Sequence, residues 1–228
     1  WVTLRNYRDD NGLDADIKIR THDIATLGLW GPQAKNALGH FIDPSEITIE
    51  NFPFAAAKNL TLNLSEGKKI DVWASRISYV GESGWEIYLN NDSEEGLALY
   101  DSLLEVGVVP VGIETYANSR RLEKSFRLQG ADLETEYNAC ESAIERRLVK
   151  EADFHGKAAH LAHREEEPCA MLCTMTIDDL NVSGSMRYPV GNSPIIDPAS
   201  GEVPLDSKGR RSYATGMSYC PSIKKFVV

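Results

Sequence analysis

The feature that most constrains the fold is a hairpin pattern in the first half of the chain. Residues 69–78 are rich in β-branched and aromatic side chains, which favour a strand. Residues 84–89 alternate, with Trp85, Ile87 and Leu89 on one face and Glu86 and Tyr88 on the other. Between them, the Gly-Glu-Ser-Gly run 81–84 supplies two glycines for a tight reversal with positive φ. The pattern therefore predicts two antiparallel strands joined by a tight turn.

Glu86 lies on the polar face of this hairpin and is the first candidate site residue. A carboxylate on a rigid strand can accept two hydrogen bonds from a flat donor edge, such as the 2-amino-4-oxo edge of a pterin. Tyr79 could supply an aromatic wall for the pterin ring. The alternative is a solvated glutamate on the outer face of a two-layer sheet, and the spacing alone favours that alternative.

Length and charge limit the function classes. The chain has 228 residues, enough for one large domain or two modest ones. The formal net charge of −10 argues against nucleic acid or an anionic membrane surface as a partner. No apolar run is long enough to span a bilayer. The first residues contain neither an initiating Met nor an apolar leader, so we expect a fragment or a processed form.

Cysteine and histidine usage indicates neither a disulfide scaffold nor a metal site. The four cysteines, without a C-x-x-C pair, are Cys140, Cys169, Cys173 and Cys220. Such sparse cysteines indicate a reducing compartment. His160 and His163 have a helical spacing that could share a metal, but no cysteine or carboxylate pattern completes the site. We therefore expect no metal.

Periodicity and turn residues predict the remaining elements. Helices are predicted over 32–41, 91–107 and 114–125, and further strands over 23–29, 58–64 and 170–177. A charged break at 165–168 follows a domain boundary that we place near Lys150. Beyond it, short strands separated by turns, the first at 182–184, indicate a small all-β barrel or sandwich.

Four motifs occur in one order along the chain: residues 29–34, 76–86, 119–132 and 153–157. Together they resemble the glycine-cleavage T-protein (aminomethyltransferase) family. The second is similar to its Tyr-Thr-Gly-Glu-Asp-Gly-aromatic-Glu run, and the third to its Ser-Leu-Arg-Leu-Glu helix with the following Gly-x-Asp. Glu123-Lys124 and the run 176–179 resemble most the folate-binding C-terminal part of dimethylglycine and sarcosine dehydrogenases or oxidases, with the N-terminal part missing.

The resemblance implies an α+β fold. Antiparallel-sheet folate-binding domains of the aminomethyltransferase type would be followed by a small, jelly-roll-like C-terminal β barrel. Residues 1–48 would be the remainder of an α+β unit truncated at its N-terminus, residues 49–150 the folate-binding α+β domain, and residues 151–228 the barrel.

The resemblance also implies a function. The family transfers a one-carbon unit from an aminomethyl or N-methyl donor to tetrahydrofolate, giving 5,10-methylene-tetrahydrofolate. We expect the chain to be the folate half of an N-methyl amine dehydrogenase or oxidase. Tetrahydrofolate is the expected cofactor, with FAD only if a flavin domain precedes this chain. The expected partners are small-molecule folate, an N-methyl amine and an FAD-containing oxidoreductase domain. The expected location is cytoplasmic, or the mitochondrial matrix in a eukaryote.

Four residues match positions that are associated with folate binding in the family, and the resemblance predicts that they bind folate here. Glu86 matches the carboxylate that holds the pterin edge, and Tyr79 matches the aromatic residue beside it. Tyr219 matches a tyrosine that lines the active-site mouth. Arg121 matches the arginine within the family's helix, where a structural role competes with folate binding. The catalytic acid or base stays unknown, because the family's catalytic Asp lies in an N-terminal portion that this chain lacks.

Two positions depart from the family pattern. Ala117 stands where the T-protein has an arginine that contacts folate. Arg120 replaces a leucine and places a charge where the family has an apolar side chain.

Two alternative functions remain open. A folate-binding protein without transferase activity, such as the iron–sulfur assembly relatives, would carry a Lys-Gly-Cys-Tyr-x-Gly-Gln motif near residues 150–157, where this chain has none. A folate-dependent demethylase of a sulfonium or aryl methyl donor would use the same fold and release methyl-folate. The sequence does not identify the donor.

Overall fold

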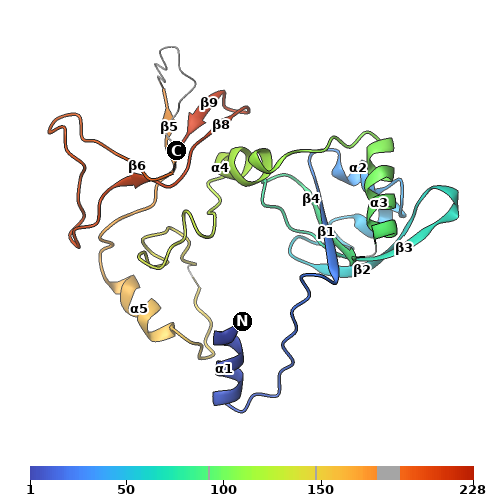
Figure 1. The fold of residues 1–228 in the computed structure, drawn as a ribbon, viewed down its shortest axis with the longest axis horizontal. Coiled ribbons are helices and arrows are strands. Elements are labelled where there is room, and N and C mark those ends of the chain that lie inside the picture. The colour runs from blue at the N-terminus through green and yellow to red at the C-terminus, as the bar shows by residue number, and fades with distance from the viewer. Residues whose placement is uncertain (92, 147, 179–190) are drawn as a thin grey trace. The chain divides into compact units, whose positions relative to one another are not determined.

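The computed structural model describes residues 1–91, 93–146, 148–178 and 191–228 (Figure 1). The chain divides into two compact units, one of residues 1–78 with 82–110 and the other of residues 79–81 with 111–228. The division into 1–48, 49–150 and 151–228 made from the sequence uses other boundaries and stays a prediction.

The first unit is built on a four-stranded antiparallel sheet with the order β1-β4-β3-β2. Its strands are β1 (Ile24–Trp30), β2 (Ala57–Asn63), β3 (Lys69–Ser75) and β4 (Gly84–Asn90). β4 pairs with β1 from Gly84 opposite Trp30 to Asn90 opposite Ile24. It pairs with β3 over a shorter stretch that includes Glu86 opposite Ser75. Because β4 lies between β1 and β3, the alternation of its side chains defines which face of the sheet is apolar.

Alternation along β4 sends its side chains to opposite faces, as the sequence predicts. Trp85, Ile87 and Leu89 are buried, whereas Glu86 and Tyr88 are only partly buried. Helices α2 (Ala34–Leu38) and α3 (Ser93–Glu105) lie against the sheet and contribute to the same core as the three apolar β4 residues (Figure 1). Burial of this apolar surface is the main stabilising contribution in the unit.

The predicted hairpin of β3 and β4 is confirmed, but its predicted tight turn is wrong. Gly84 already belongs to β4, and residues 76–83 form a longer connection. Arg76 is the first residue after β3. Its guanidinium donates to the carbonyls of Thr48 and Phe52 at 3.2 and 2.6 Å and lies over the Trp85 ring at 5.3 Å. These contacts anchor the start of the connection.

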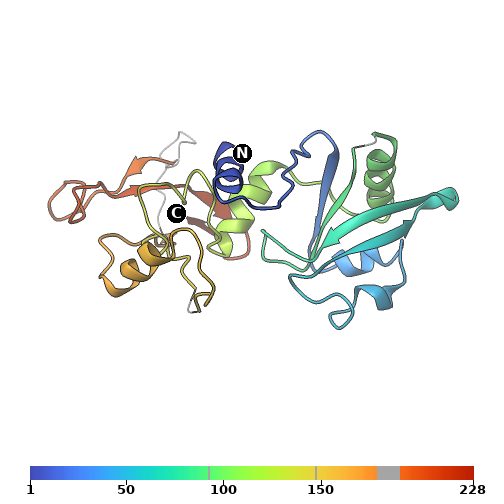
Figure 2. The same cartoon turned by 90° about the horizontal axis from the view of Figure 1, so that it is seen from below.

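Helical segments outside the sheet are short. They are α1 (Val2–Asp10), η1 (Pro44–Ile47), η2 (Ser65–Gly67), the π-helix η3 (Glu114–Arg120), α4 (Arg121–Glu123) and α5 (Lys157–Glu165) (Figure 2). The helix predicted over 114–125 is thus present as a π-helix that continues into α4. In the part of the chain that the structure describes, no helix combines the length and the apolar character needed to cross a membrane.

The second unit contains two small antiparallel sheets. One has the order β5-β9-β8 and the other pairs β6 with β7. The strands are β5 (Thr176–Ile177), β6 (Ser193–Pro194), β7 (Tyr213–Ala214), β8 (Ser218–Cys220) and β9 (Lys225–Val227). The α+β class with antiparallel sheets is confirmed. Among the described residues no closed barrel is formed, so the jelly-roll-like barrel is not confirmed, and the turn predicted at 182–184 lies outside them.

The strand predicted over 170–177 is reduced to β5 for an identifiable reason. The Leu172 amide donates to the Glu141 carbonyl at 2.8 Å, and Arg127 donates to the Leu172 carbonyl and the Thr174 hydroxyl, both at 3.2 Å. A loop and an arginine side chain thus take the backbone hydrogen bonds of Leu172 that a neighbouring strand would otherwise make.

Replacing Trp85 should test the core of the first unit. Its side chain is fully buried and packs near Phe52, with ring centroids 6.3 Å apart. We expect Trp85→Ala to lower the free energy of unfolding by about 3–5 kcal/mol, because a large buried ring leaves a cavity. Trp73→Ala is the control, since Trp73 is 48 % exposed, and should cost about 1 kcal/mol or less. Urea unfolding followed by circular dichroism measures both, and equal losses would contradict this core assignment.

Candidate functional site

Glu86 lies on the sheet face opposite to the core, among small neighbours. Its cross-strand partners are Gly28 on β1 and Ser75 on β3. The Glu86 carboxylate accepts a hydrogen bond from the hydroxyl of Tyr88, two positions further along the same face. Each carboxylate oxygen can accept more than one hydrogen bond. The Tyr88 hydroxyl therefore holds the carboxylate in position on this face.

An aromatic ring lies next to Glu86 that the sequence reasoning missed. A Cβ atom on Gly28 would come within 2.1 Å of the Trp30 ring, so the indole occupies the space of a side chain at position 28. The Trp30 Nε1 donates to the Ile77 carbonyl at 3.0 Å, which holds the ring in place. A glycine within a strand, two positions before a tryptophan, was the available signal, because alternate strand residues share a face.

Tyr79 belongs to the second unit and packs into an aromatic cluster there. Its ring stacks on Phe126 at a centroid distance of 6.1 Å and contacts Tyr116 at 5.5 Å. Its hydroxyl donates to the Arg127 carbonyl at 2.8 Å. Burial raises the pKa of Tyr79, so the phenol stays protonated at neutral pH. These contacts give Tyr79 a packing role, and its role as a pterin wall stays a prediction.

Arg121 is buried, with 1 % of its surface exposed, and pairs with Asp132. Its Nε donates to the Ala117 carbonyl at 2.7 Å, and a terminal nitrogen donates to the Phe126 carbonyl at 3.1 Å. Asp132 also accepts from the Leu128 amide at 2.8 Å. A buried charge needs such compensation. The pair thus organises the turn after α4, and folate binding by Arg121 stays a prediction.

Tyr219 lies in β8, and 44 % of its surface is exposed. Its ring meets Phe226 edge-on at 5.3 Å, and its carbonyl accepts from the Ser119 hydroxyl at 2.8 Å. The backbone is therefore fixed while the ring is accessible, as a ligand-contacting side chain requires. Its place in a folate site remains a prediction.

The unusual charge at Arg120 is compensated locally. Its guanidinium donates to Glu123 at 2.7 Å and to the Ser222 hydroxyl at 3.0 Å. Glu123 also accepts from the Ser222 amide at 3.0 Å. These bonds tie the end of η3 and α4 to the turn after β8, so the Arg120 charge is compensated.

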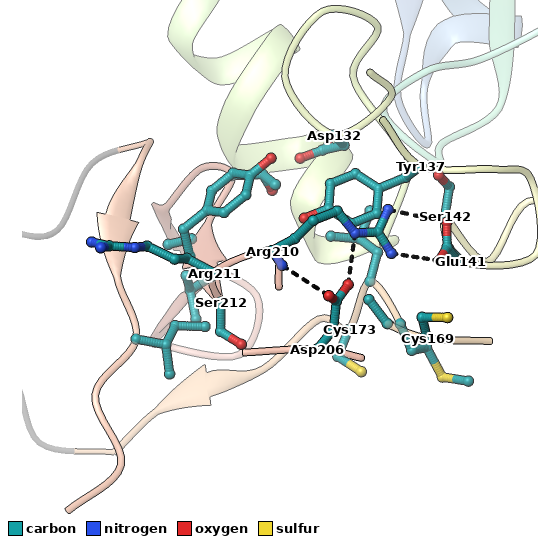
Figure 3. A pocket seen from close by; sticks show the side chains of 18 of the residues that line it. Asp132, Tyr137, Glu141, Ser142, Cys169, Cys173, Asp206, Arg210, Arg211 and Ser212 are labelled. Carbon is teal, nitrogen blue, oxygen red and sulfur yellow. Dashed lines mark hydrogen bonds and ion pairs between the residues drawn. The ribbon is translucent and has the colours of Figure 1, made fainter. Parts of the chain in front are cut away.

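The second unit contains a cavity of about 380 Å³ (Figure 3). Arg210 lies on its wall, donates to Glu141 and Asp206, both at 2.6 Å, and stacks over the Tyr137 ring at 4.3 Å. The hydrogen bond from Arg210 lowers the pKa of Glu141 to about 2. The rest of the lining is rich in apolar and sulfur-bearing side chains, including Cys169, Met171, Cys173, Met175 and Leu205. The cavity includes none of the four predicted folate residues.

The residues that the structure describes give no support for a metal site. No group of three or more His, Cys, Asp or Glu side chains there is arranged to hold an ion. The absence of a metal from the function stays a prediction.

We expect acid to destabilise the second unit through Glu141. Its pKa is lowered from 4.5 to about 2 in the folded chain, so its stabilising contribution is complete above pH 4.5 and is lost as the pH falls toward 2. Glu141→Gln should therefore reduce the loss of unfolding free energy over this pH range. Glu134→Gln, at an exposed position, is the control. Urea unfolding at several pH values measures the effect, and identical pH profiles of all three proteins would contradict it.

Comparisons with known proteins identify the family. The model described as "GCVT N-terminal domain" matches residues 1–151. "Dimethylglycine dehydrogenase, mitochondrial" of Homo sapiens is 35% identical over 182 residues, which cover 76% of this chain and 20% of that protein. "Aminomethyltransferase" of Symbiobacterium thermophilum is 30% identical over 197 residues, covering 83% of this chain and 50% of that protein.

A third relative is matched along nearly the whole chain. "Aminomethyltransferase" of Corynebacterium aurimucosum is 29% identical, and the match covers 99% of this chain and 66% of that protein. The chain spans about a fifth of the human dehydrogenase and about half of the Symbiobacterium transferase. The predicted kinship with the T-protein family is thus confirmed, and the chain belongs to the GCVT N-terminal domain family.

Proposed function

We propose that the protein containing this chain transfers a one-carbon unit to tetrahydrofolate. Family membership supports folate-dependent one-carbon transfer in general. The observation that carries the proposal is the setting of Glu86: a carboxylate fixed by Tyr88 on the exposed sheet face, with Gly28 and Ser75 on either side. This setting suits an acceptor for the flat donor edge of a pterin.

The residues of the first unit would bind and orient the folate. Glu86 would accept hydrogen bonds from the 2-amino group and the neighbouring ring N–H, while Tyr88 keeps the carboxylate in position. The Trp30 ring beside Gly28 offers an apolar surface on the same face. When bound, tetrahydrofolate supplies the nucleophilic amine that accepts the carbon. Orientation of that amine is the contribution expected of this chain, because positioning alone can supply much of a rate enhancement.

The finer proposal concerns the donor, the product and the partner domain. Because dimethylglycine dehydrogenases are among the relatives, we take an N-methyl amine as the donor and 5,10-methylene-tetrahydrofolate as the product. An FAD-containing oxidoreductase domain would first oxidise the amine. The word "mitochondrial" in the names of those relatives supports a matrix location in a eukaryote.

The other three predicted folate residues rest on the resemblance alone. Tyr79 would pack beside the pterin, Tyr219 would line the mouth of the site and Arg121 would support it. No acid or base is assigned to this chain.

Glu86→Gln tests the proposal. We expect the full-length protein to lose about 1.5–3 kcal/mol of tetrahydrofolate binding, roughly a 10- to 150-fold rise in Kd, because a charged acceptor becomes neutral. Isothermal titration calorimetry measures the affinity. Asp101→Asn, at an exposed position on α3, is the matched control and should bind like the wild type. Equal affinities of the Glu86→Gln and control proteins would remove the proposed role of Glu86.

Tyr88→Phe tests whether the carboxylate must be held in place. Removal of one hydroxyl should weaken tetrahydrofolate binding by about 1 kcal/mol, or roughly fivefold, since Glu86 loses the donor that orients it. The double variant Tyr88→Phe with Glu86→Gln should be less than additive, because the two side chains act through one bond. Full additivity in calorimetric titrations would count against a joint role.

Product analysis separates the proposed reaction from the demethylase alternative. We expect the full-length protein to convert tetrahydrofolate and an N-methyl amine into methylene-tetrahydrofolate and the demethylated amine, with the flavin domain taking up the two electrons. Chromatography and mass spectrometry detect both products. Formation of methyl-tetrahydrofolate from a sulfonium or aryl methyl donor would select the demethylase instead.

A further inference from the structure

The exposed face of the first unit's sheet carries an aromatic pair beside Glu86. Trp73 on β3 and Tyr88 on β4 lie directly opposite each other, with ring centroids 5.0 Å apart and planes tilted by 41°. Nearly half of the Trp73 surface, 48 %, is exposed, and neither ring belongs to the buried core of this unit. A large exposed aromatic side chain on an open sheet offers a stacking surface for a planar ligand.

A groove of about 660 Å³ follows this aromatic pair across the sheet. Besides Trp73 and Tyr88, its lining includes the polar residues Arg20, Asn59, Thr61, Asp71 and Asn90. The Asp71 carboxylate accepts from the Thr61 hydroxyl at 2.6 Å, so part of its hydrogen-bonding capacity is already used. Arg20 brings a positive charge, and its pair with Asp23 at 2.9 Å is exposed and therefore weak. The groove thus combines an aromatic surface, amide groups, the Arg20 guanidinium and the Asp71 carboxylate.

Tyr88 connects this groove to the carboxylate on the same sheet face. Its ring lines the groove, while its hydroxyl donates to Glu86. Positions 86 and 88 are about 7 Å apart along an extended strand. Trp73 lies one strand further across the sheet. A ligand with its polar edge at Glu86 would therefore extend over Tyr88 and reach Trp73 with its next ring.

We propose that this groove holds the aryl-glutamate half of the folate, with the aryl ring on Trp73. The inference rests on the proposed function, because it takes Glu86 as the acceptor for the pterin edge. Folate has the matching order of parts: a flat pterin, an aryl ring and an amide-linked glutamate. The glutamate carboxylates then face Arg20, and the linking amide meets the asparagine side chains of the groove.

Calorimetric titration of the full-length protein with two ligands tests the inference. One ligand is tetrahydrofolate, and the other is 6-methyl-tetrahydropterin, which lacks the aryl-glutamate half. Trp73→Ala should raise the Kd for tetrahydrofolate about fivefold or more and leave the Kd for the tetrahydropterin unchanged. Trp73→Phe keeps a ring and should retain most of the affinity. Arg20→Gln should likewise weaken tetrahydrofolate alone.

Trp1→Ala is the matched control, because Trp1 is also 48 % exposed but lies outside the groove. It should bind both ligands like the wild type. If Trp73→Ala leaves tetrahydrofolate binding unchanged while Glu86→Gln still weakens it, the groove assignment is overturned and the proposed function stands. Equal weakening of both ligands by Trp73→Ala also overturns it, since a general distortion would then explain the loss. If Glu86→Gln changes neither ligand, the role of Glu86 fails, and the inference fails with it.

Discussion

The pairing of β4 with β1 is the constraint on which the first unit depends. The ladder extends along all of β4, so its register cannot shift without losing the buried positions of Trp85 and Ile87. A slip of one residue would exchange the two faces and bury Glu86. The apolar core, and not the carboxylate itself, therefore determines where Glu86 points. A carboxylate placed by the packing of its neighbours is held rigidly, as the proposed recognition of a pterin edge requires.

Arginine side chains form many of the hydrogen bonds and ion pairs that hold irregular segments of the second unit together. Arg121 pairs with buried Asp132, Arg127 bonds to the segment before β5, and Arg210 joins Glu141 to Asp206. Each guanidinium can donate several hydrogen bonds in a plane, which suits it to irregular backbone. Such bonds replace strand ladders where the chain is not paired. Substitution of one partner is therefore expected to destabilise the unit, since it leaves a buried charge without compensation.

The exposed sheet face of the first unit carries the side chains on which the proposed folate binding depends. Small residues flank Glu86, the Trp30 ring stands where Gly28 has no side chain, and Tyr88 joins the carboxylate to the aromatic groove. None of these relations concerns the second unit. The proposed binding of the pterin edge can therefore be examined on one rigid sheet.

The sequence by itself determined the alternation of β4, the hairpin, helix α3 and the family, because these follow from local periodicity and from motifs within short stretches. Tertiary structure decided the rest. The Trp30 ring is held by the carbonyl of Ile77, 47 positions away, and the connection after β3 is shaped by the contacts of Arg76 with residues before β2. Such contacts join residues that are distant in the chain, so no local pattern records them.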